Sequence, residues 1–204
     1  MLKNIAVFVS GSGSNLQSLI DACKDGRLKG GLIRLVIAGK PGIYALERAK
    51  QAGISAMVFE KSAYPSLSDM FEEIIRVLKE NNIDLIVLAG YLTILTPNII
   101  NAFRNKIINI HPSLIPNFCG DGYYGIRVHE AVIAAREKIS GATVHYVDEG
   151  TDTGQVILQK IVPVLEDDTP ESLQKRVLAV EHKLLPMAVQ KIITGENDDK
   201  KSVN

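Results

Sequence analysis

The sequence predicts an α/β protein built on one doubly wound, mostly parallel sheet. Short apolar runs alternate along the chain with longer segments whose apolar residues recur at helical spacing, the pattern of this fold class. The run Ile5–Val9 is apolar throughout, as expected for a strand covered on both faces. With 204 residues and 46% hydrophobic residues, the chain suits a single domain with a sizeable core. We expect this domain over residues 1–194 and a polar, disordered tail over residues 195–204.

The predicted strands are the apolar runs that end at glycine, proline or polar residues. Five of them cover residues 5–9, 33–38, 55–59, 85–89 and 107–111. Two more follow at residues 141–147 and 156–162. Because helices separate the earlier strands, we expect parallel pairing through right-handed crossovers.

The predicted helices show start signals and one apolar face. They begin at Leu16, Tyr44, Ser66, Thr96, Val128 and Thr169. Residues 66–69 have capping-box chemistry, and Thr96 and Thr169 each precede a proline that suits a first turn. In the last helix we expect a kink at Pro186, and we expect Glu181 and His182 to face away from the packed side.

Composition excludes several classes of function. With 23 basic and 23 acidic residues, the chain offers no broad electropositive surface for nucleic acid or anionic lipid. Cys23 and Cys119 are isolated, which argues against a disulfide framework and a zinc cluster. No signal-type segment and no apolar run near the roughly 20 residues of a membrane span is present. We therefore expect a soluble cytoplasmic protein.

The segment Ile107–His111 is the strongest candidate for a catalytic strand. It leaves the sheet at the Pro112 turn, and in open α/β sheets the carboxyl ends of strands hold the functional sites. Because side chains alternate along a strand, Asn109 and His111 project the same way and offer an amide donor and a titratable imidazole. A histidine at a strand end is also common in a purely structural role, and this segment alone leaves both interpretations open.

A glycine loop joins the first strand to the first helix. Residues 10–15 read Ser-Gly-Ser-Gly-Ser-Asn, so the backbone can turn sharply and free amides of the helix N-terminus can meet an anion. The loop lacks the third glycine of a dinucleotide fingerprint and the Gly-Lys-Ser/Thr of a triphosphate loop. It fits a single phosphate monoester, although a tight turn with Ser and Asn capping the helix remains the alternative.

Three further loops follow predicted strands. Residues 90–95 are mostly apolar, and they either line a slot for a flat aromatic ligand or fold onto the core. Residues 117–125 are rich in glycine and aromatic residues, as in functional loops and lids. Residues 148–154 place three carboxylates in one turn, where they are either solvated or face the same edge as His111.

Three motifs in order resemble the folate-dependent formyltransferases. They are Ser-Gly-x-Gly-Ser-Asn-Leu, Asn-Ile-His-Pro-Ser-Leu-Ile-Pro and Asp-Glu-Gly-x-Asp-x-Gly, and the likeness covers nearly the whole chain. It implies a Rossmann-like formyltransferase fold. The N-terminal glycine loop and Glu181-His182 in the closing helix resemble the branch that formylates glycinamide ribonucleotide in purine biosynthesis. The resemblance then implies 10-formyltetrahydrofolate as cosubstrate and no metal. From charge and hydropathy we expect no nucleic acid or membrane partner, and we expect a monomer or homodimer.

The resemblance also implies roles for individual residues. Asn109, His111 and Asp152, rather than Asp148, match the catalytic residues of the family. The positions that match its phosphate and ribose site are Gly13, Ser14, Asn15 and Glu181. The positions that match its folate site are Leu92, Thr93, Ile94, Leu95 and Asn109, with Lys61 loosely aligned. The chain departs from the family pattern at Thr93, Asp121 and Gln155. The resemblance therefore does not determine the affinity for folate, the rigidity of the loops or the local charge at these positions.

The expected reaction is an acyl transfer. Asn109 would donate a hydrogen bond to the developing oxyanion, a contribution of about 3 kcal/mol. A protonated His111 would stabilise the same oxygen and relay a proton, with Asp152 favouring the imidazolium. Formyl-tetrahydrofolate deformylase, methionyl-tRNA formyltransferase and an inactive binding module remain alternatives. The first two normally carry further domains, for which we expect no room, and the intact trio argues against the third. A covalent intermediate on Cys119 has no adjacent base.

Overall fold

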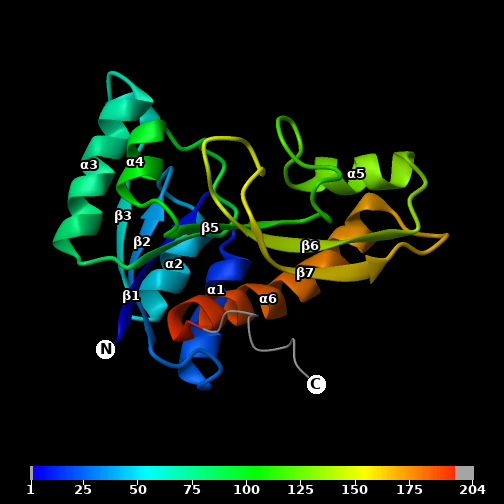
Figure 1. Ribbon diagram of the computed structural model, residues 1–204, viewed down its shortest axis with the longest axis horizontal. Helices are drawn as coiled ribbons and strands as arrows, with labels where there is room; N and C mark the ends of the chain where they lie inside the picture. The colour runs from blue at the N-terminus through cyan, green and yellow to red at the C-terminus, as the bar shows by residue number, and fades with distance from the viewer. Residues whose placement is uncertain (1, 196–204) are drawn as a thin grey trace, which may run out of the picture.

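The computed structural model describes residues 2–195 and consists of one seven-stranded sheet with helices on both faces (Figure 1). The predicted tail, apart from Gly195, lies outside the described residues. The strands are β1 Lys3–Val9, β2 Gly31–Ala38, β3 Ser55–Val58, β4 Leu85–Leu88, β5 Ile107–His111, β6 Ile139–Tyr146 and β7 Val156–Pro163. The helices are α1 Ser14–Lys24, α2 Tyr44–Gln51, α3 Leu67–Glu80, α4 Pro97–Ala102, α5 Ile126–Ala134 and α6 Pro170–Thr194, with a 3₁₀ turn at Lys61–Ala63.

The sheet is parallel over its first five strands and antiparallel at one end. Its order is β3-β2-β1-β4-β5-β6-β7. β5 pairs antiparallel with β6, and β6 pairs antiparallel with β7. The order reverses between β1 and β4, and a reversal of this kind opens a crevice at the carboxyl ends of the strands. The doubly wound, mostly parallel α/β sheet predicted from the sequence is confirmed.

The two faces of the sheet have separate apolar cores, because successive residues of a buried strand point to opposite faces. Val7 and Val9 of β1 pack with helices α1, α2 and α6 on one face. Phe8 of the same strand packs with Phe71 of α3 and Ile99 of α4 on the other face. Strand β1 thus lies in the middle of the fold, and its carboxyl end lies beside the crevice.

Helix α6 closes the first of these faces. Its start is fixed by a capping box, in which the Thr169 side chain accepts from the Ser172 amide and the Ser172 side chain accepts from the Thr169 amide. The helix runs through Pro186 to Thr194 as one element and contacts α1, β6 and β7. Glu181 does not face away from the packed side as expected, since only 8% of it is exposed. No helix in residues 2–195 is long and apolar enough to cross a membrane.

Candidate active site

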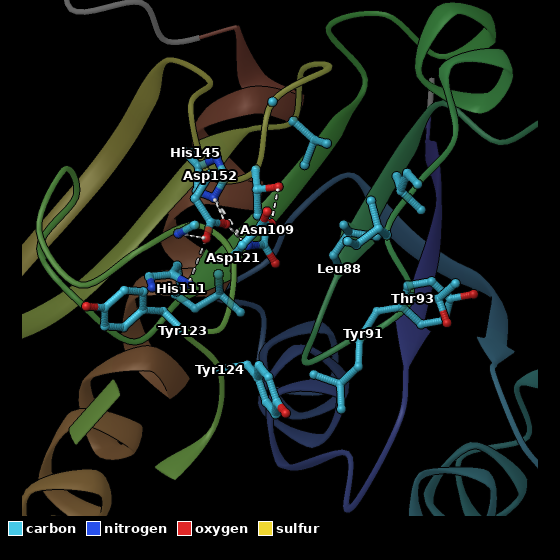
Figure 2. Close-up of a pocket in the computed structure, with 18 of the residues that line it drawn as sticks. Leu88, Tyr91, Thr93, Asn109, His111, Asp121, Tyr123, Tyr124, His145 and Asp152 are labelled. Carbon is cyan, nitrogen blue, oxygen red and sulfur yellow. Dashed lines mark hydrogen bonds and ion pairs between the residues drawn. The ribbon is translucent and has the colours of Figure 1, made fainter. Parts of the chain in front are cut away.

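A pocket of about 520 Å³ opens at the carboxyl ends of β4 and β5. Most of its lining comes from four segments, namely the loop after β4, the end of β5, residues 120–125 and the turn at residues 147–152, and His145 of β6 adds to them. Figure 2 shows Leu88, Tyr91 and Thr93 on one side and Asn109, His145 and Asp152 on the other. The pocket therefore has an apolar wall facing a polar one, the usual form of a site for a small organic ligand.

The apolar wall is the loop at residues 90–95, and the structure answers the question that the sequence left open. Tyr91 and Leu95 are buried, with 8% of each exposed, and they anchor the loop on the core. Leu92 and Ile94 stay 62% and 67% exposed, and both line the pocket. The loop thus folds onto the core at its ends and offers apolar surface between them.

Three predicted catalytic residues meet at the polar wall. One carboxylate oxygen of Asp152 lies 3.4 Å from His111 Nδ1. The other oxygen of Asp152 accepts a hydrogen bond from Asn109 Nδ2 at 3.4 Å. His111 also bonds through Nε2 to the carbonyl oxygen of Phe118 at 2.9 Å. A carbonyl only accepts, so Nε2 carries a proton and Nδ1 faces the carboxylate. The structure brings Asp152, not Asp148, to the imidazole.

The turn that carries Asp152 is shaped by its own contacts. Asp148 accepts from the Gly150 amide at 3.1 Å and from the Thr153 hydroxyl at 2.6 Å, and so closes the turn. Asp152 has a positive φ of 59°, a conformation that acidic residues tolerate better than most. Its carboxylate accepts from the Gly120 amide at 3.0 Å, which ties the turn to the loop after β5.

Sequence reasoning gave no role to His145 on β6, which completes the cluster. Its Nδ1 bonds to the carbonyl oxygen of Tyr146 at 2.8 Å, so Nδ1 carries the proton. Its Nε2 lies 3.2 Å from Asn109 Nδ2 and 3.4 Å from Asp152. The antiparallel register, which pairs Asn109 with His145, explains this contact. No local pattern in the sequence predicts the pairing of Asn109 with His145.

Burial dominates the electrostatics of His111. Burial lowers the pKa of His111 more than the Asp152 carboxylate and the Phe118 carbonyl raise it. Burial raises the pKa of Asp152, but its contacts with His145 and His111 and the hydrogen bond from the Gly120 amide outweigh burial and hold that pKa below its usual value. The open pocket therefore favours a neutral imidazole beside a carboxylate, whereas the sequence led us to expect an imidazolium.

His129 on α5 is a further histidine that the sequence analysis did not single out. Only 1% of it is exposed, and its Nδ1 has no hydrogen-bond partner within residues 2–195. Burial lowers the pKa of His129 to about 4, with His111 adding to the effect. His129 is therefore neutral near pH 7, and the pocket is lined by His111 and His145 instead.

The glycine loop leads from β1 into α1 through a left-handed backbone turn at Gly13. Gly13 has a φ of 72°, and a side-chain Cβ there would lie 2.6 Å from Ala45 Cβ, so only glycine fits. No side chain in the described part of the chain caps the N-terminus of α1. Arg48 of α2 donates to the Ser12 carbonyl at 2.9 Å and places a cation beside the loop. Free amides and a nearby guanidinium suit a phosphate better than a plain capped turn.

Glu181 and Asn15 meet behind this loop. Asn15 Nδ2 donates to Glu181 at 2.7 Å, and burial raises the pKa of Glu181. This bond spans 166 positions in the chain and explains why Glu181 turns inward. Asn15 Oδ1 and His182 Nε2 are buried without a hydrogen-bond partner among the described residues. Orphaned polar atoms of this kind mark a place where a polar ligand can bind.

Not all predicted site residues come together. Gly13, Ser14, Asn15 and Glu181 gather at the α1 end of the crevice, whereas the folate-type residues line the pocket. Lys61 lies exposed in the 3₁₀ turn after β3 and does not line the pocket. Within residues 2–195, no group of three or more His, Cys, Asp or Glu side chains is arranged to hold a metal ion.

The family model described as Formyl transferase matches residues 3–189. A phosphoribosylglycinamide formyltransferase of Haemophilus influenzae is 39% identical over 95% of the chain and 89% of its own length. The chain spans 62% of the chloroplastic phosphoribosylglycinamide formyltransferase of Arabidopsis thaliana, at 43% identity, and 14% of a trifunctional purine biosynthetic protein of Drosophila melanogaster.

Solved structures agree with this likeness. The phosphoribosylglycinamide formyltransferase of Bacillus halodurans superposes with a TM-score of 0.89 at 40% identity, covering 98% of this chain and all of that one. The glycinamide ribonucleotide transformylase 1 of Symbiobacterium toebii gives a TM-score of 0.90 at 40% identity, covering 95% and 89% of the two chains. Sequence and fold agree, and the chain belongs to the formyl transferase family.

Proposed function

We propose that this protein transfers the formyl group of 10-formyltetrahydrofolate to the amine of glycinamide ribonucleotide, giving formylglycinamide ribonucleotide and tetrahydrofolate in purine biosynthesis. The observation that carries the proposal is the cluster of Asn109, His111 and Asp152 at the polar wall of an apolar pocket. The named relatives agree with it. The cytoplasmic location, and the choice between monomer and homodimer, stay predictions.

Asn109 is suited to stabilise the oxyanion of the tetrahedral intermediate. Its Nδ2 donates to His145 at 3.2 Å and to Asp152 at 3.4 Å. The longer bond is the weaker one, so the formyl oxygen can replace Asp152 as acceptor while His145 keeps the amide oriented. One preorganised donor of this kind contributes about 3 kcal/mol to lowering the barrier.

His111 and Asp152 are suited to move the proton. The amine nitrogen bonds to the formyl carbon, and the bond from that carbon to N10 of the folate breaks. A neutral His111 accepts the amine proton on Nδ1, and the imidazolium then returns a proton to the departing N10. Asp152, 3.4 Å from Nδ1, stabilises the imidazolium while it exists. Unlike the expectation from sequence, this scheme starts from the neutral imidazole that burial favours.

The glycine loop and Glu181 are suited to hold the ribonucleotide. The free amides at Gly13 and Ser14 would bind the phosphate, and Arg48 adds a positive charge behind them. Asn15 and Glu181 would hydrogen-bond the ribose or the amine end. Binding at these remote groups places the amine near the formyl carbon and makes the reaction effectively intramolecular.

The loop at residues 90–95 is suited to hold the folate. Leu92 and Ile94 offer exposed apolar surface for the pterin, and Thr93 lies between them on the same wall. Lys61 stands outside the pocket, so a contact with folate would involve the part of the molecule that extends beyond it.

The test is an absorbance assay of the purified protein with 10-formyltetrahydrofolate, with and without glycinamide ribonucleotide. We expect tetrahydrofolate release only when the ribonucleotide is present, and formylated product of the expected mass. Equal release without the ribonucleotide would indicate a deformylase. Folate binding without release would indicate an inactive binding module, and either result would reject the proposal.

A further inference from the structure

One hydrogen bond joins the glycine loop to the folate-type loop. The amide of Leu92 donates to the Ser10 hydroxyl oxygen at 3.0 Å, across 82 positions of the chain. Ser10 is the first residue after β1 and begins the glycine loop, and Leu92 lies on the apolar wall of the pocket. Ser10, at the start of the glycine loop, thus forms a hydrogen bond with the folate-type loop on the other side of the crevice.

The loop at residues 90–95 depends on this bond. Across residues 2–195, it is the only hydrogen bond made by the backbone of this loop. The ends of the loop are anchored by packing, since Tyr91 lies edge-on against Phe8 at 5.2 Å and Leu95 is buried. Between these anchors, Leu92 is 62% exposed and has little packing of its own to fix it.

Ser10 is itself rigidly placed. The residue before it, Val9, accepts from the Gly39 amide at 3.3 Å, and the residue after it, Gly11, accepts from the Ala45 amide at 3.2 Å. A side-chain Cβ at Gly39 would lie 3.9 Å from the Ser10 hydroxyl oxygen and 3.6 Å from the Tyr91 ring. The hydroxyl therefore stands where the ends of β1 and β2 meet the loop after β4.

We propose that Ser10 is a positioning residue for the formyl donor, because its hydroxyl holds the Leu92 backbone in the shape that lines the pocket. The inference rests on the proposed function, since it takes folate as the occupant of that wall. Ser10 acts on the folate through Leu92. The residues assigned to the ribonucleotide at this loop, Gly13, Ser14 and Asn15, do not take part in this bond.

The test compares three variants of the full chain. Ser10→Ala removes the acceptor, Ser10→Cys keeps the size but offers only a weak acceptor, and Ser10→Thr keeps the hydroxyl. For Ala and Cys we expect KM for 10-formyltetrahydrofolate to rise roughly three- to tenfold, the effect of one lost hydrogen bond. In these two variants we expect kcat and the KM for the ribonucleotide to stay within about twofold of the wild-type values. Ser10→Thr should keep the wild-type KM for 10-formyltetrahydrofolate.

Ser55→Ala serves as the matched control, since it removes an exposed hydroxyl from β3 that makes no hydrogen bond in the described part of the chain. An unchanged folate KM in Ser10→Ala, an equal rise in both KM values, or a Cys variant that behaves like wild type would overturn the proposal. Calorimetric binding of tetrahydrofolate separates the two inferences. A wild type that binds tetrahydrofolate without turnover rejects the proposed function, while a weaker affinity in Ser10→Ala still supports the role of Ser10.

Discussion

At the scale of single residues, Asp152 connects the polar cluster of the pocket, because His111, His145, Asn109 and the Gly120 amide all contact its carboxylate. Asp152→Asn keeps the shape and removes the charge that stabilises the imidazolium. We expect kcat to fall about 10²- to 10⁴-fold, the range for loss of acid–base catalysis, with both KM values nearly unchanged. His111→Ala should cause a similar fall. Steady-state kinetics measure both.

Asp167→Asn is the control for this series, because Asp167 is exposed and lies before α6, away from the pocket. It should keep wild-type kinetics. Wild-type rates in Asp152→Asn or His111→Ala would remove those residues from the proposed mechanism, and a large rise in KM at constant kcat would make them binding residues only.

The direction of the His111 pKa gives a second prediction. Because burial holds the pKa of His111 below its ordinary value of 6.5, the neutral base persists into mildly acidic solution. The ring should titrate below pH 6.5, as followed by NMR of the imidazole. In Asp152→Asn the midpoint should fall further, since the carboxylate is a group that raises this pKa. A midpoint that rises in the variant would contradict the assigned contact.

His129 predicts how stability depends on pH. Its pKa is about 4 in the folded protein, against 6.5 when exposed. Above pH 6.5 it is neutral in both states, but between pH 6.5 and 4 the unfolded chain binds a proton that the folded chain excludes. The free energy of unfolding should therefore decrease as the pH is lowered from 6.5 to 4, and this group should account for up to about 3 kcal/mol of the decrease. Urea unfolding of His129→Gln at several pH values should show a flatter profile.

Other groups also titrate in this range, so the comparison with wild type is what counts. If both proteins lose stability in parallel between pH 6.5 and 4, His129 is not the group responsible. A variant that is less stable at pH 7 but has a shallower slope still agrees with the prediction, because the slope reports proton binding and the offset reports packing.

At the scale of elements, the glycine loop shows why its position requires glycine. Gly13→Ala combines a positive φ of 72° with a Cβ 2.6 Å from Ala45 Cβ, whereas Gly42 has the same φ and open space around it. We expect Gly42→Ala to cost about 1 kcal/mol and Gly13→Ala distinctly more, because packing strain adds to backbone strain. Denaturant unfolding measures both.

The kinetics of the same pair carry a functional prediction. Gly13→Ala should raise KM for the ribonucleotide and leave KM for the folate nearly unchanged, the reverse of the pattern expected for Ser10→Ala. Gly42→Ala should leave both unchanged. Equal stability of the two variants would mean that α2 moves aside and that contact with Ala45 does not restrict the loop.

The helices and strands also show which parts of the structure could be predicted from the sequence. The apolar runs predicted all seven strands, because runs of apolar residues that end at turn residues leave a local signal, strongest in the buried strands β1 and β4. The last helix was found from Thr169 and Pro170, yet its periodicity placed Glu181 outside, since no local pattern shows a partner 166 positions away. His145 was missed for the same reason: only the antiparallel pairing of β5 with β6 brings it to Asn109.

At the scale of the whole molecule, the reversal of strand order between β1 and β4 sets the two half-sites side by side. The glycine loop follows β1 and the folate-type loop follows β4. A ligand bound to either loop therefore contacts a segment next to a central strand and stabilises the folded state. A ligand that binds only the folded state at 100 times its Kd adds about 2.7 kcal/mol of stability. For a domain of this size, that corresponds to a rise in Tm of roughly 5–11 °C.

Glycinamide ribonucleotide and tetrahydrofolate, which do not react with each other, should each give such a rise, and together they should give about the sum. Additivity is expected because the residues assigned to the two ligands do not overlap, and free energies of independent sites add. Thermal unfolding with each ligand and with both measures this. Ribose 5-phosphate, which lacks the glycinamide, should stabilise less. A joint rise no larger than the greater single one would mean that the ligands compete for one site, and the separation of the half-sites would then be wrong.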